Sequence, residues 1–259
     1  MSPDEEQLET VLISGGGGRL GSAFVRALIA SGHSVCILDS LPCAVTIKRC
    51  GLDDTDPSDF KVIQGDATDP ADIDHAIESC VALYGRVTAA VHCAYPRSDQ
   101  WGTRFEDLGS EKLYQDLAAQ LGGAILFSQR VIRQFRSQGF GNLIHISSIL
   151  GVAPPKFRHY EGVDMVSPIE YSAIKAGIIA VTRYLAKYCH NQGIRVNCIC
   201  PGGILDDQPP EFLERYRKDC NSKGMLDSED IVGTLLFLMS SRSSFITGQS
   251  FVIDDGWSL

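Results

Sequence analysis

Short apolar runs and amphipathic segments alternate along most of the chain. The apolar runs are short enough for single strands, and the segments between them have the apolar spacing of helices. Parallel strands buried on both faces produce such continuous apolar runs, and helices connect one strand to the next. The pattern therefore predicts an α/β fold with a doubly wound, seven-stranded parallel sheet.

The predicted elements follow one another without an internal repeat or a low-complexity linker, so a single domain over residues 1–259 is expected. Strands are predicted at Thr10–Ser14, Ser34–Leu38, Lys61–Gln64, Ala89–Cys93, Asn142–Ser147, Arg195–Ile199 and Gln249–Ile253. Helices are predicted at about Arg19–Ser31, weakly near Val45, at Pro70–Tyr84, within Glu106–Gln138, at about Pro168–Gln192 and in pieces within Pro209–Ser241. The stretch Gly151–Ser167 is predicted to be irregular and defines an insert at about residues 151–168.

Composition and charge narrow the class of protein. Hydrophobic residues make up 44% and charged residues 21% of the 259 residues, which is typical of a globular protein with a sizeable core. A net charge of -9 disfavours nucleic acid and anionic membranes as partners. The acidic segment Met1–Thr10 does not resemble a secretory signal, and no apolar run is long enough to span a bilayer. A cytoplasmic protein with a small-molecule substrate is expected.

The nine cysteines include no Cys-x-x-Cys pair and are expected to be reduced, mostly buried thiols. Cys198 and Cys200 would lie on one face of a strand, which leaves a zinc site open. No histidine-rich motif accompanies them, so no bound metal is predicted.

A glycine-rich loop connects the first predicted strand to the first helix. A backbone without side chains can approach a pyrophosphate at the amino terminus of a helix, so the order strand, glycine run, helix favours a dinucleotide site over a flexible turn. The cofactor-binding residues predicted in this loop are Ser14, Gly15, Gly18, Arg19, Leu20 and Gly21.

Asp39 follows the second strand, eighteen residues after Gly21. A carboxylate there accepts hydrogen bonds from both hydroxyls of an adenosine ribose and repels a 2′-phosphate, which favours NAD over NADP. Arg19 beside the loop would partly offset that repulsion, so NADP stays open. The alternative interpretation of Asp39 is a turn residue at the end of a strand.

Tyr171 and Lys175 are four residues apart, so a phenol and an ammonium lie on one face of the predicted helix. The cation would stabilise a phenolate, although such pairs also occur by chance on surface helices. Upstream, Ile144–Ser148 have the pattern of a strand, whose carboxyl end brings a serine hydroxyl to the cofactor crevice. The three features together indicate chemistry at one site.

Taken together, the motifs resemble those of the short-chain dehydrogenase/reductase family, from about Thr10 to Trp257. The resemblance implies a Rossmann-type sheet, an NAD(P) cofactor, and dimers or tetramers built from the long helix and the helix that carries Tyr171. The matching pieces are the glycine loop, Asp66 in Gln64–Gly65–Asp66–Ala67, Ile146–Ser147–Ser148, Tyr171 with Lys175, Arg195–Val196–Asn197, Pro201–Gly202–Gly203–Ile204, Thr247–Gly248–Gln249 and Asp254–Asp255–Gly256.

The resemblance also implies roles for single residues. Tyr171 would be the acid/base, Lys175 would lower the pKa of the phenol and hold the nicotinamide ribose, and Ser148 would bind the substrate oxygen. The Ile204 backbone would meet the nicotinamide carboxamide. Asp66 and Ala67 would lie at the adenine edge, the alternative for Asp66 being a capped turn. The other cofactor positions implied are Cys93, Ala94, Tyr95, Pro201 and Gly202.

The sequence departs from the family pattern at four places. Arg19 replaces a loop glycine, and His92–Cys93–Ala94–Tyr95 stands where Asn-Asn-Ala-Gly is usual, so Tyr95 would lie beside the cofactor path or line the substrate pocket. Gln120 replaces the asparagine that anchors a water leading to Lys175, a role that the longer amide is expected to keep. Asp206 and Asp207, without the usual threonine, follow Pro201–Gly202.

The 23-residue step from Ser148 to Tyr171 is long for the family and places the insert over the mouth of the predicted site. Lys156, Arg158 and His159 in it would grip a phosphate or carboxylate, or else belong to a solvated loop. The insert and Ala94–Arg97 resemble a subgroup of the family linked to flagellin-glycan and nine-carbon acidic sugar genes, which implies a sugar or sugar-phosphate substrate.

The sequence thus predicts an NAD(P)-dependent oxidoreductase that interconverts an alcohol and a ketone. Reduction of a 3-oxoacyl thioester is the alternative reaction. A catalytically silent nucleotide-binding or redox-sensing protein is the alternative class. Small and apolar residues on the two helices are candidates for an oligomer face. Packing against the protein's own sheet explains them equally well. They are Leu121, Gly122, Gly123, Ala176 and Ile179.

Overall fold

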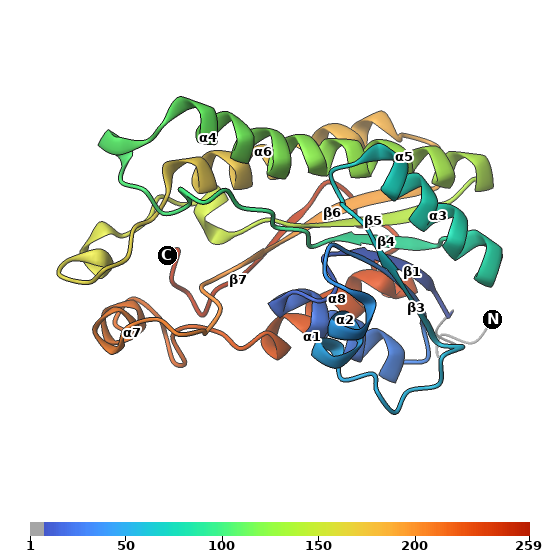
Figure 1. The fold of residues 1–259 in the computed structure, drawn as a ribbon, viewed down its shortest axis with the longest axis horizontal. Helices are drawn as coiled ribbons and strands as arrows, with labels where there is room; N and C mark the ends of the chain where they lie inside the picture. Colours follow the sequence, from blue (N-terminus) through green and yellow to red (C-terminus); the bar gives the residue numbers. More distant parts are fainter. Residues whose placement is uncertain (1–7) are drawn as a thin grey trace.

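In the computed structural model, residues 8–259 are described, and their strands form one parallel sheet in the order β3-β2-β1-β4-β5-β6-β7 (Figure 1). The predicted seven-stranded, doubly wound α/β fold is confirmed. The chain reverses its direction of winding between β1 and β4, which pair side by side. Such a switch point opens a crevice at the carboxyl ends of the strands. The strands are β1 (Thr10–Ser14), β2 (Ser34–Asp39), β3 (Phe60–Gln64), β4 (Ala89–His92), β5 (Gly141–Ile146), β6 (Ile194–Pro201) and β7 (Ser250–Ile253).

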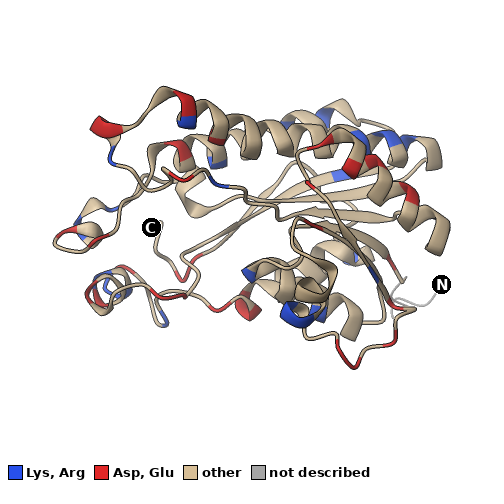
Figure 2. Cartoon of the chain, viewed as in Figure 1, with Lys and Arg blue, Asp and Glu red and all other residues tan. Residues whose placement is uncertain are grey.

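Helices cover both faces of the sheet. In Figure 1, α3, α4, α5 and α6 lie above it, and α1, α2 and α8 lie below it. Figure 2 shows that most charged residues lie on helices and connecting segments rather than on the strands. The helices are α1 (Arg19–Ala30), α2 (Cys43–Cys50), α3 (Pro70–Tyr84), α4 (Ser110–Asp116), α5 (Gly123–Gln138), α6 (Ile169–Tyr188), α7 (Pro210–Arg217) and α8 (Glu229–Met239).

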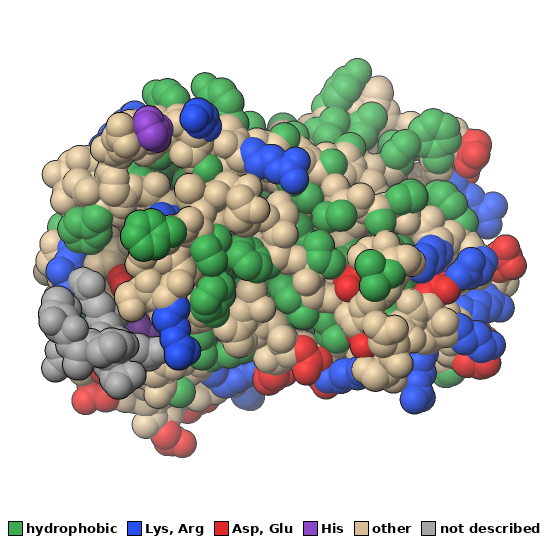
Figure 3. All heavy atoms as spheres, turned by 180° about the vertical axis from the view of Figure 1, so that it is seen from behind, with side chains coloured by type: hydrophobic (Ala, Val, Ile, Leu, Met, Phe, Trp, Pro, Cys, Tyr) green, Lys and Arg blue, Asp and Glu red, His purple; other side chains and the backbone are tan. Residues whose placement is uncertain are grey.

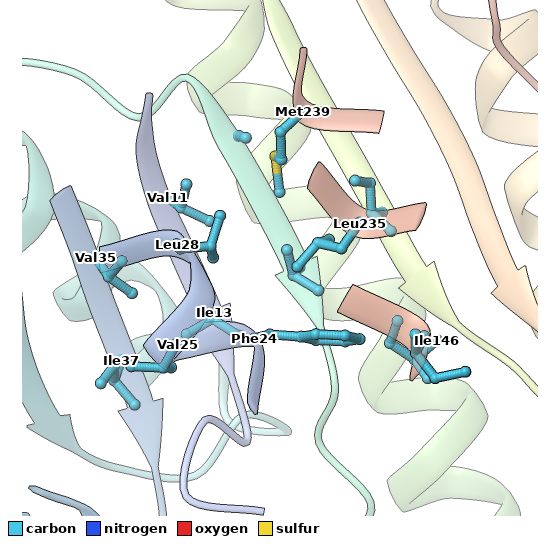
Figure 4. Packing of buried hydrophobic residues seen from close by; sticks show 14 of the residues in the cluster. Val11, Ile13, Phe24, Val25, Leu28, Val35, Ile37, Ile146, Leu235 and Met239 are labelled. Carbon is cyan, nitrogen blue, oxygen red and sulfur yellow. The ribbon is translucent and has the colours of Figure 1, made fainter. Parts of the chain in front are cut away.

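The apolar side chains of the strands contribute to two hydrophobic cores, one on each face of the sheet. Val11 and Ile13 of β1 pack with Phe24 of α1 and Leu235 of α8 beneath the sheet (Figure 4). Leu12, between them, belongs to the cluster under α3 and α5. Because successive side chains point to opposite faces, a strand covered on both sides must be apolar throughout.

Two long helices differ from their predicted extents. A π-helical turn, Leu117–Gly122, interrupts the helix predicted within Glu106–Gln138. The helix predicted to reach Gln192 ends at Tyr188, because Asn191 and Gly193 have φ angles of 60° and 67° and turn the chain into β6. Such angles are incompatible with a right-handed helix.

The insert is largely irregular, with one 3₁₀ turn at Phe157–Tyr160. That turn contacts α7, and the two lie side by side at the left of Figure 1. The buried side chains of Phe212, Tyr216 and Trp257 join them in one cluster beside the carboxyl ends of the strands. The insert therefore packs on α7 through His159 and Tyr160, while other parts of it, such as Val152 and Phe157, are exposed.

Three residues of the predicted oligomer face are used inside the chain. Leu121 approaches Gly177 of α6 so closely that a Cβ there would lie 2.9 Å from it, Gly123 packs against Thr68, and Ile179 is buried. Hydrophobic side chains reach the surface on the face shown in Figure 3. A homodimer or homotetramer stays a prediction.

No helix among residues 8–259 is long and apolar enough to cross a membrane. Residues 1–7, in which the sequence predicts no signal segment, lie outside the described part of the chain.

Candidate active site

A cleft of about 630 Å³ opens at the carboxyl ends of the strands, where the sheet topology places a ligand crevice. It unites predicted residues from separate parts of the chain: Gly15, Gly18, Arg19, Leu20, Gly21, Asp39, Asp66, Ala67, Cys93, Ala94, Tyr95, Tyr171, Lys175 and Ile204.

The glycine loop is packed too closely for side chains. Gly15 has a φ of 71°, and a Cβ there would lie 2.8 Å from the Ala94 backbone. A Cβ at Gly21 would collide with the carbonyl oxygen of Gly15. The loop therefore presents bare backbone at the amino terminus of α1, as a pyrophosphate site requires.

Asp39 holds this loop from the end of β2. Its carboxylate accepts hydrogen bonds from the backbone N–H groups of Gly17 (2.7 Å) and Leu41 (3.0 Å), and its side chain is buried. Asp39 therefore both stabilises the turn at the end of β2 and lines the cleft. Asp66 behaves similarly, because its Oδ1 accepts two bonds from Thr68 while the residue lines the cleft.

Arg19, which replaces a family glycine, spans the cleft mouth. Its guanidinium pairs with Asp206 and donates to the carbonyl oxygen of Leu205 (3.1 Å). Asp206 also lines the cleft. Arg19 and Asp206, two positions at which the sequence departs from the family pattern, therefore contact each other. Arg49, a lining residue that the sequence analysis missed, donates to the carbonyl oxygen of Gly17 (3.4 Å).

Tyr171, Ser148 and Lys175 come together as predicted from their positions. Ser148 follows β5 and accepts a hydrogen bond from the backbone of Leu150 (3.1 Å). Burial raises the pKa of Tyr171, and a hydrogen bond with Ser148 opposes the rise. The Lys175 ammonium lies 5.5 Å from the centre of the Tyr171 ring.

Lys175 is deeply buried for a cation. Its Nζ donates to the Ile146 carbonyl (3.1 Å), and burial lowers its pKa to about 8. The thiols of Cys198, Cys93 and Cys200 oppose this shift. An easily deprotonated lysine beside a phenol is suited to proton transfer at the cleft.

Gln120 lies in the π-helical turn that precedes α5. Its side chain is 3% exposed, and neither its amide nitrogen nor its amide oxygen has a hydrogen-bond partner among the described residues. Gln120 is not among the cleft-lining residues. Buried amides of this kind are normally hydrogen-bonded, to water where no protein group is near.

The rings of Tyr95 and Tyr171 form an aromatic wall of the cleft, and Trp101, which is outside the cleft lining, packs against both. The Tyr95 ring meets the Tyr171 ring edge to face at 5.7 Å between centres, and Trp101 meets them at 5.4 and 6.0 Å. Tyr95 therefore lines the pocket, one of the two places expected for it. Trp101 was missed because it lies in an irregular segment without a motif.

Three predicted cofactor residues are placed outside the cleft lining. Ser14 is fully buried, and its hydroxyl shares a hydrogen bond with His92 Nδ1 (2.8 Å). Pro201 ends β6, and Gly202 donates its N–H to Ile253 of β7 (2.7 Å). These residues connect neighbouring strands at their carboxyl ends, beside the cleft.

The cations of the insert do not face the cleft freely. Arg158 and His159 both bind the Asp219 carboxylate, and Lys156 Nζ lies 3.9 Å from it. Lys156 also donates to the carbonyl oxygen of Trp257 (2.6 Å). Asp219 thus engages Lys156, Arg158 and His159, and none of the three lines the cleft, so the structure does not place them on a substrate anion there.

Cys198 and Cys200 lie on one face of β6, with their sulfurs 3.9 Å apart, in an apolar cluster with Ile174 and Ile178. Within residues 8–259, no three His, Cys, Asp or Glu residues are grouped as metal ligands. The pair packs as buried thiols.

With this geometry established, comparison with known proteins places the chain in a family. A family model described as enoyl-(acyl carrier protein) reductase matches residues 19–258. Post-translational flagellin modification protein A of Campylobacter coli is 40% identical over 96% of this chain and 98% of its own. The chain belongs to the short-chain dehydrogenase/reductase family and is an oxidoreductase of that family.

Further relatives share the fold and the class of reaction. A short-chain dehydrogenase from Leptospira borgpetersenii, solved with bound NAD⁺, superposes with a TM-score of 0.87 at 33% identity, covering 99% of this chain and 95% of its own. A protein of Rhizobium meliloti named "Probable galactose dehydrogenase GalD" is 30% identical over 95% of this chain and 93% of its own.

Proposed function

We propose that the protein is an NAD-dependent oxidoreductase that interconverts an alcohol and a ketone on a sugar or sugar-phosphate-like substrate. The observation that carries the proposal is the convergence of Ser148, Tyr171 and Lys175 beside a glycine-loop cleft. The flagellin-modification and galactose relatives support a carbohydrate substrate.

The residues of the cleft fit a dinucleotide. Bare glycine backbone at the start of α1 would receive the pyrophosphate, Asp39 the adenosine ribose, and Lys175 the nicotinamide ribose. Pro201, Gly202 and Ile204 would border the nicotinamide end, and Ser14 would support the loop. When bound, the nicotinamide accepts or supplies the hydride.

The protein's own groups would manage the proton. In oxidation, the Tyr171 oxygen takes the proton of the substrate hydroxyl, and in reduction it returns that proton. Ser148 donates a hydrogen bond to the substrate oxygen and stabilises the charge that develops there. The charged form of Lys175 would favour the phenolate and so oppose the rise that burial causes in the pKa of Tyr171.

Gln120 would complete the path of the proton to solvent. Its buried amide, which has no partner among the described residues, is suited to bind a water between it and Lys175. This assignment carries the family asparagine's role to a longer side chain.

Reduction of a 3-oxoacyl thioester is the second candidate, favoured by a 27% identical relative from Mycobacterium bovis named 3-oxoacyl-[acyl-carrier-protein] reductase MabA. Cytoplasmic location stays a prediction, as does the extent of the insert at about 151–168 as a substrate loop.

The direct test combines binding and turnover. Purified protein is titrated with NADH and NADPH by fluorescence and calorimetry, and then screened with sugars, sugar phosphates and 3-oxoacyl thioesters. NADH binding with carbohydrate turnover supports the proposal, whereas thioester turnover alone selects the second candidate. A protein that binds a nucleotide and turns over nothing is a silent binding or sensing protein.

A further inference from the structure

Arg97 is a cleft residue that the proposed chemistry leaves without a role. It lines the same cleft as Tyr171 and Lys175, and its guanidinium carbon lies 5.4 Å from the centre of the Tyr95 ring. Among the described residues, no carboxylate forms an ion pair with it. An arginine on an aromatic ring keeps its fork of donors available for a planar or tetrahedral anion.

The other cations around the site are already engaged. Arg19 binds Asp206, and Arg49 donates to the Gly17 carbonyl on the cofactor side. Arg158 of the insert binds Asp219. Lys175 is buried beside Tyr171. Arg97 is thus the cation of this cleft that is free to meet a second negative charge.

The segment that carries Arg97 is anchored rather than loose. The next residue, Ser98, donates both its backbone N–H and its hydroxyl to the buried Asp116 carboxylate, each at 2.7 Å. Asp116 makes these bonds with Ser98 and, among the described residues, forms no ion pair with Arg97. The anchor fixes Arg97 at the aromatic wall.

The wall and the guanidinium together fit one kind of molecule. The centre of the Tyr95 ring lies 5.4 Å from the guanidinium carbon of Arg97 and 5.7 Å from the centre of the Tyr171 ring. Arg97 and Tyr171 both contact Tyr95 in the same cleft, so one substrate can meet both side chains. Aromatic faces favour the apolar C–H face of a sugar, and the arginine favours its anion.

We infer that the substrate is an anionic sugar, a phosphate or carboxylate of a hexose-sized ring, whose charge is bound by Arg97 while its ring lies beside Tyr95. The inference rests on the proposed function and specifies its substrate class. Arg97 acts here as a specificity residue and takes no part in proton transfer.

The test compares matched substrates. Oxidation of D-glucose, D-glucose 6-phosphate and D-glucuronate, and of the three galactose counterparts, is measured with NAD⁺ for wild type, Arg97→Met and Arg104→Met. Arg104 is an exposed arginine of the same segment outside the cleft and serves as the charge-matched control. The phosphate and carboxylate arms show which anion is preferred.

For wild type, we expect kcat/KM to be about 10- to 100-fold higher for at least one anionic sugar than for its neutral partner, the range of one charge-assisted contact. Arg97→Met brings this ratio close to one, mainly through KM. Arg104→Met keeps the wild-type ratio.

Binding supplies a readout without turnover. Trp101 packs against the cleft residues Tyr95 and Tyr171, so an anionic sugar added to the NADH complex should quench tryptophan fluorescence in wild type and not in Trp101→Phe. Equal kcat/KM for neutral and anionic sugars, or no Trp101-dependent quench by any of the four anionic compounds, overturns the inference. If the protein then still binds NADH and turns over another alcohol, only the inference fails. If it binds no NADH or turns over no alcohol, the proposed function fails.

Discussion

Arg19, at the start of α1, forms an ion pair with Asp206, in the segment after β6, and thereby joins the two sides of the cleft mouth. Each side chain is about half exposed, at 51% and 45%. An exposed pair of this kind is weak and easily exchanged for another partner. The glycine that is usual in the family at this position has no side chain that could pair with a carboxylate. The ion pair therefore depends on the arginine that this chain has there.

Asp206→Asn should tighten NADH binding about two- to fivefold, because it removes a carboxylate from the cleft and leaves Arg19 free for the anionic cofactor. The gain should shrink as ionic strength rises. Calorimetric titration at two salt concentrations measures both effects. Asp207→Asn, an exposed neighbour outside the cleft lining, is the control and should leave the dissociation constant unchanged.

Asp39→Ala should raise the kcat/KM ratio of NADP to NAD by at least about tenfold, because the carboxylate that repels a 2′-phosphate is lost while Arg19 and Arg49 remain in the cleft. NAD affinity should fall as well, since the bond from Gly17 to Asp39 orders the loop. Steady-state kinetics with both nucleotides tests this. A wild type that already prefers NADP contradicts the cofactor assignment.

Lys175→Met should stabilise the protein at neutral pH and abolish turnover. The pKa of Lys175 is about 8 in the folded state, against 10.5 as its ordinary value, so the stability of the wild type rises between these pH values and is lower below pH 8. At pH 7, the methionine variant should gain roughly 3 kcal/mol in free energy of unfolding, and the gain should vanish near pH 10.5.

Urea unfolding at several pH values measures the effect of Lys175→Met. Lys187→Met, on an exposed position of the same helix, should change stability by less than about 0.5 kcal/mol at every pH. A Lys175→Met protein less stable than wild type at pH 7 would show that the ammonium is held by more than its bond to Ile146.

Local and sheet-level rules were sufficient to predict the central parts of the site. Tyr171 and Lys175 lie four residues apart on α6, the glycine loop joins β1 to α1, and Ser148 follows a parallel strand, so their meeting follows from helix period and sheet topology. Asp39 was located in the same way.

The remaining parts depend on contacts that no local pattern encodes. Asp219 binds Arg158 and His159 of the insert from about sixty residues away along the chain. Trp101 is placed by an irregular segment whose anchor is the bond between Ser98 and Asp116. The π-helical turn at Leu117–Gly122 changes the register of Gln120, and the apolar spacing of an ordinary helix does not reveal such a turn.

The central claim is that the Tyr171 hydroxyl transfers the proton. Tyr171→Phe removes that hydroxyl and keeps the ring that packs against Tyr95 and Trp101. With the best alcohol found in the screen, the account predicts a fall in kcat of about 10²- to 10⁴-fold, while the NADH dissociation constant stays within about twofold of wild type. Tyr184→Phe, exposed on the same helix, controls for the loss of a phenol and should retain full activity. A Tyr171→Phe protein that turns over at the wild-type rate would contradict the account.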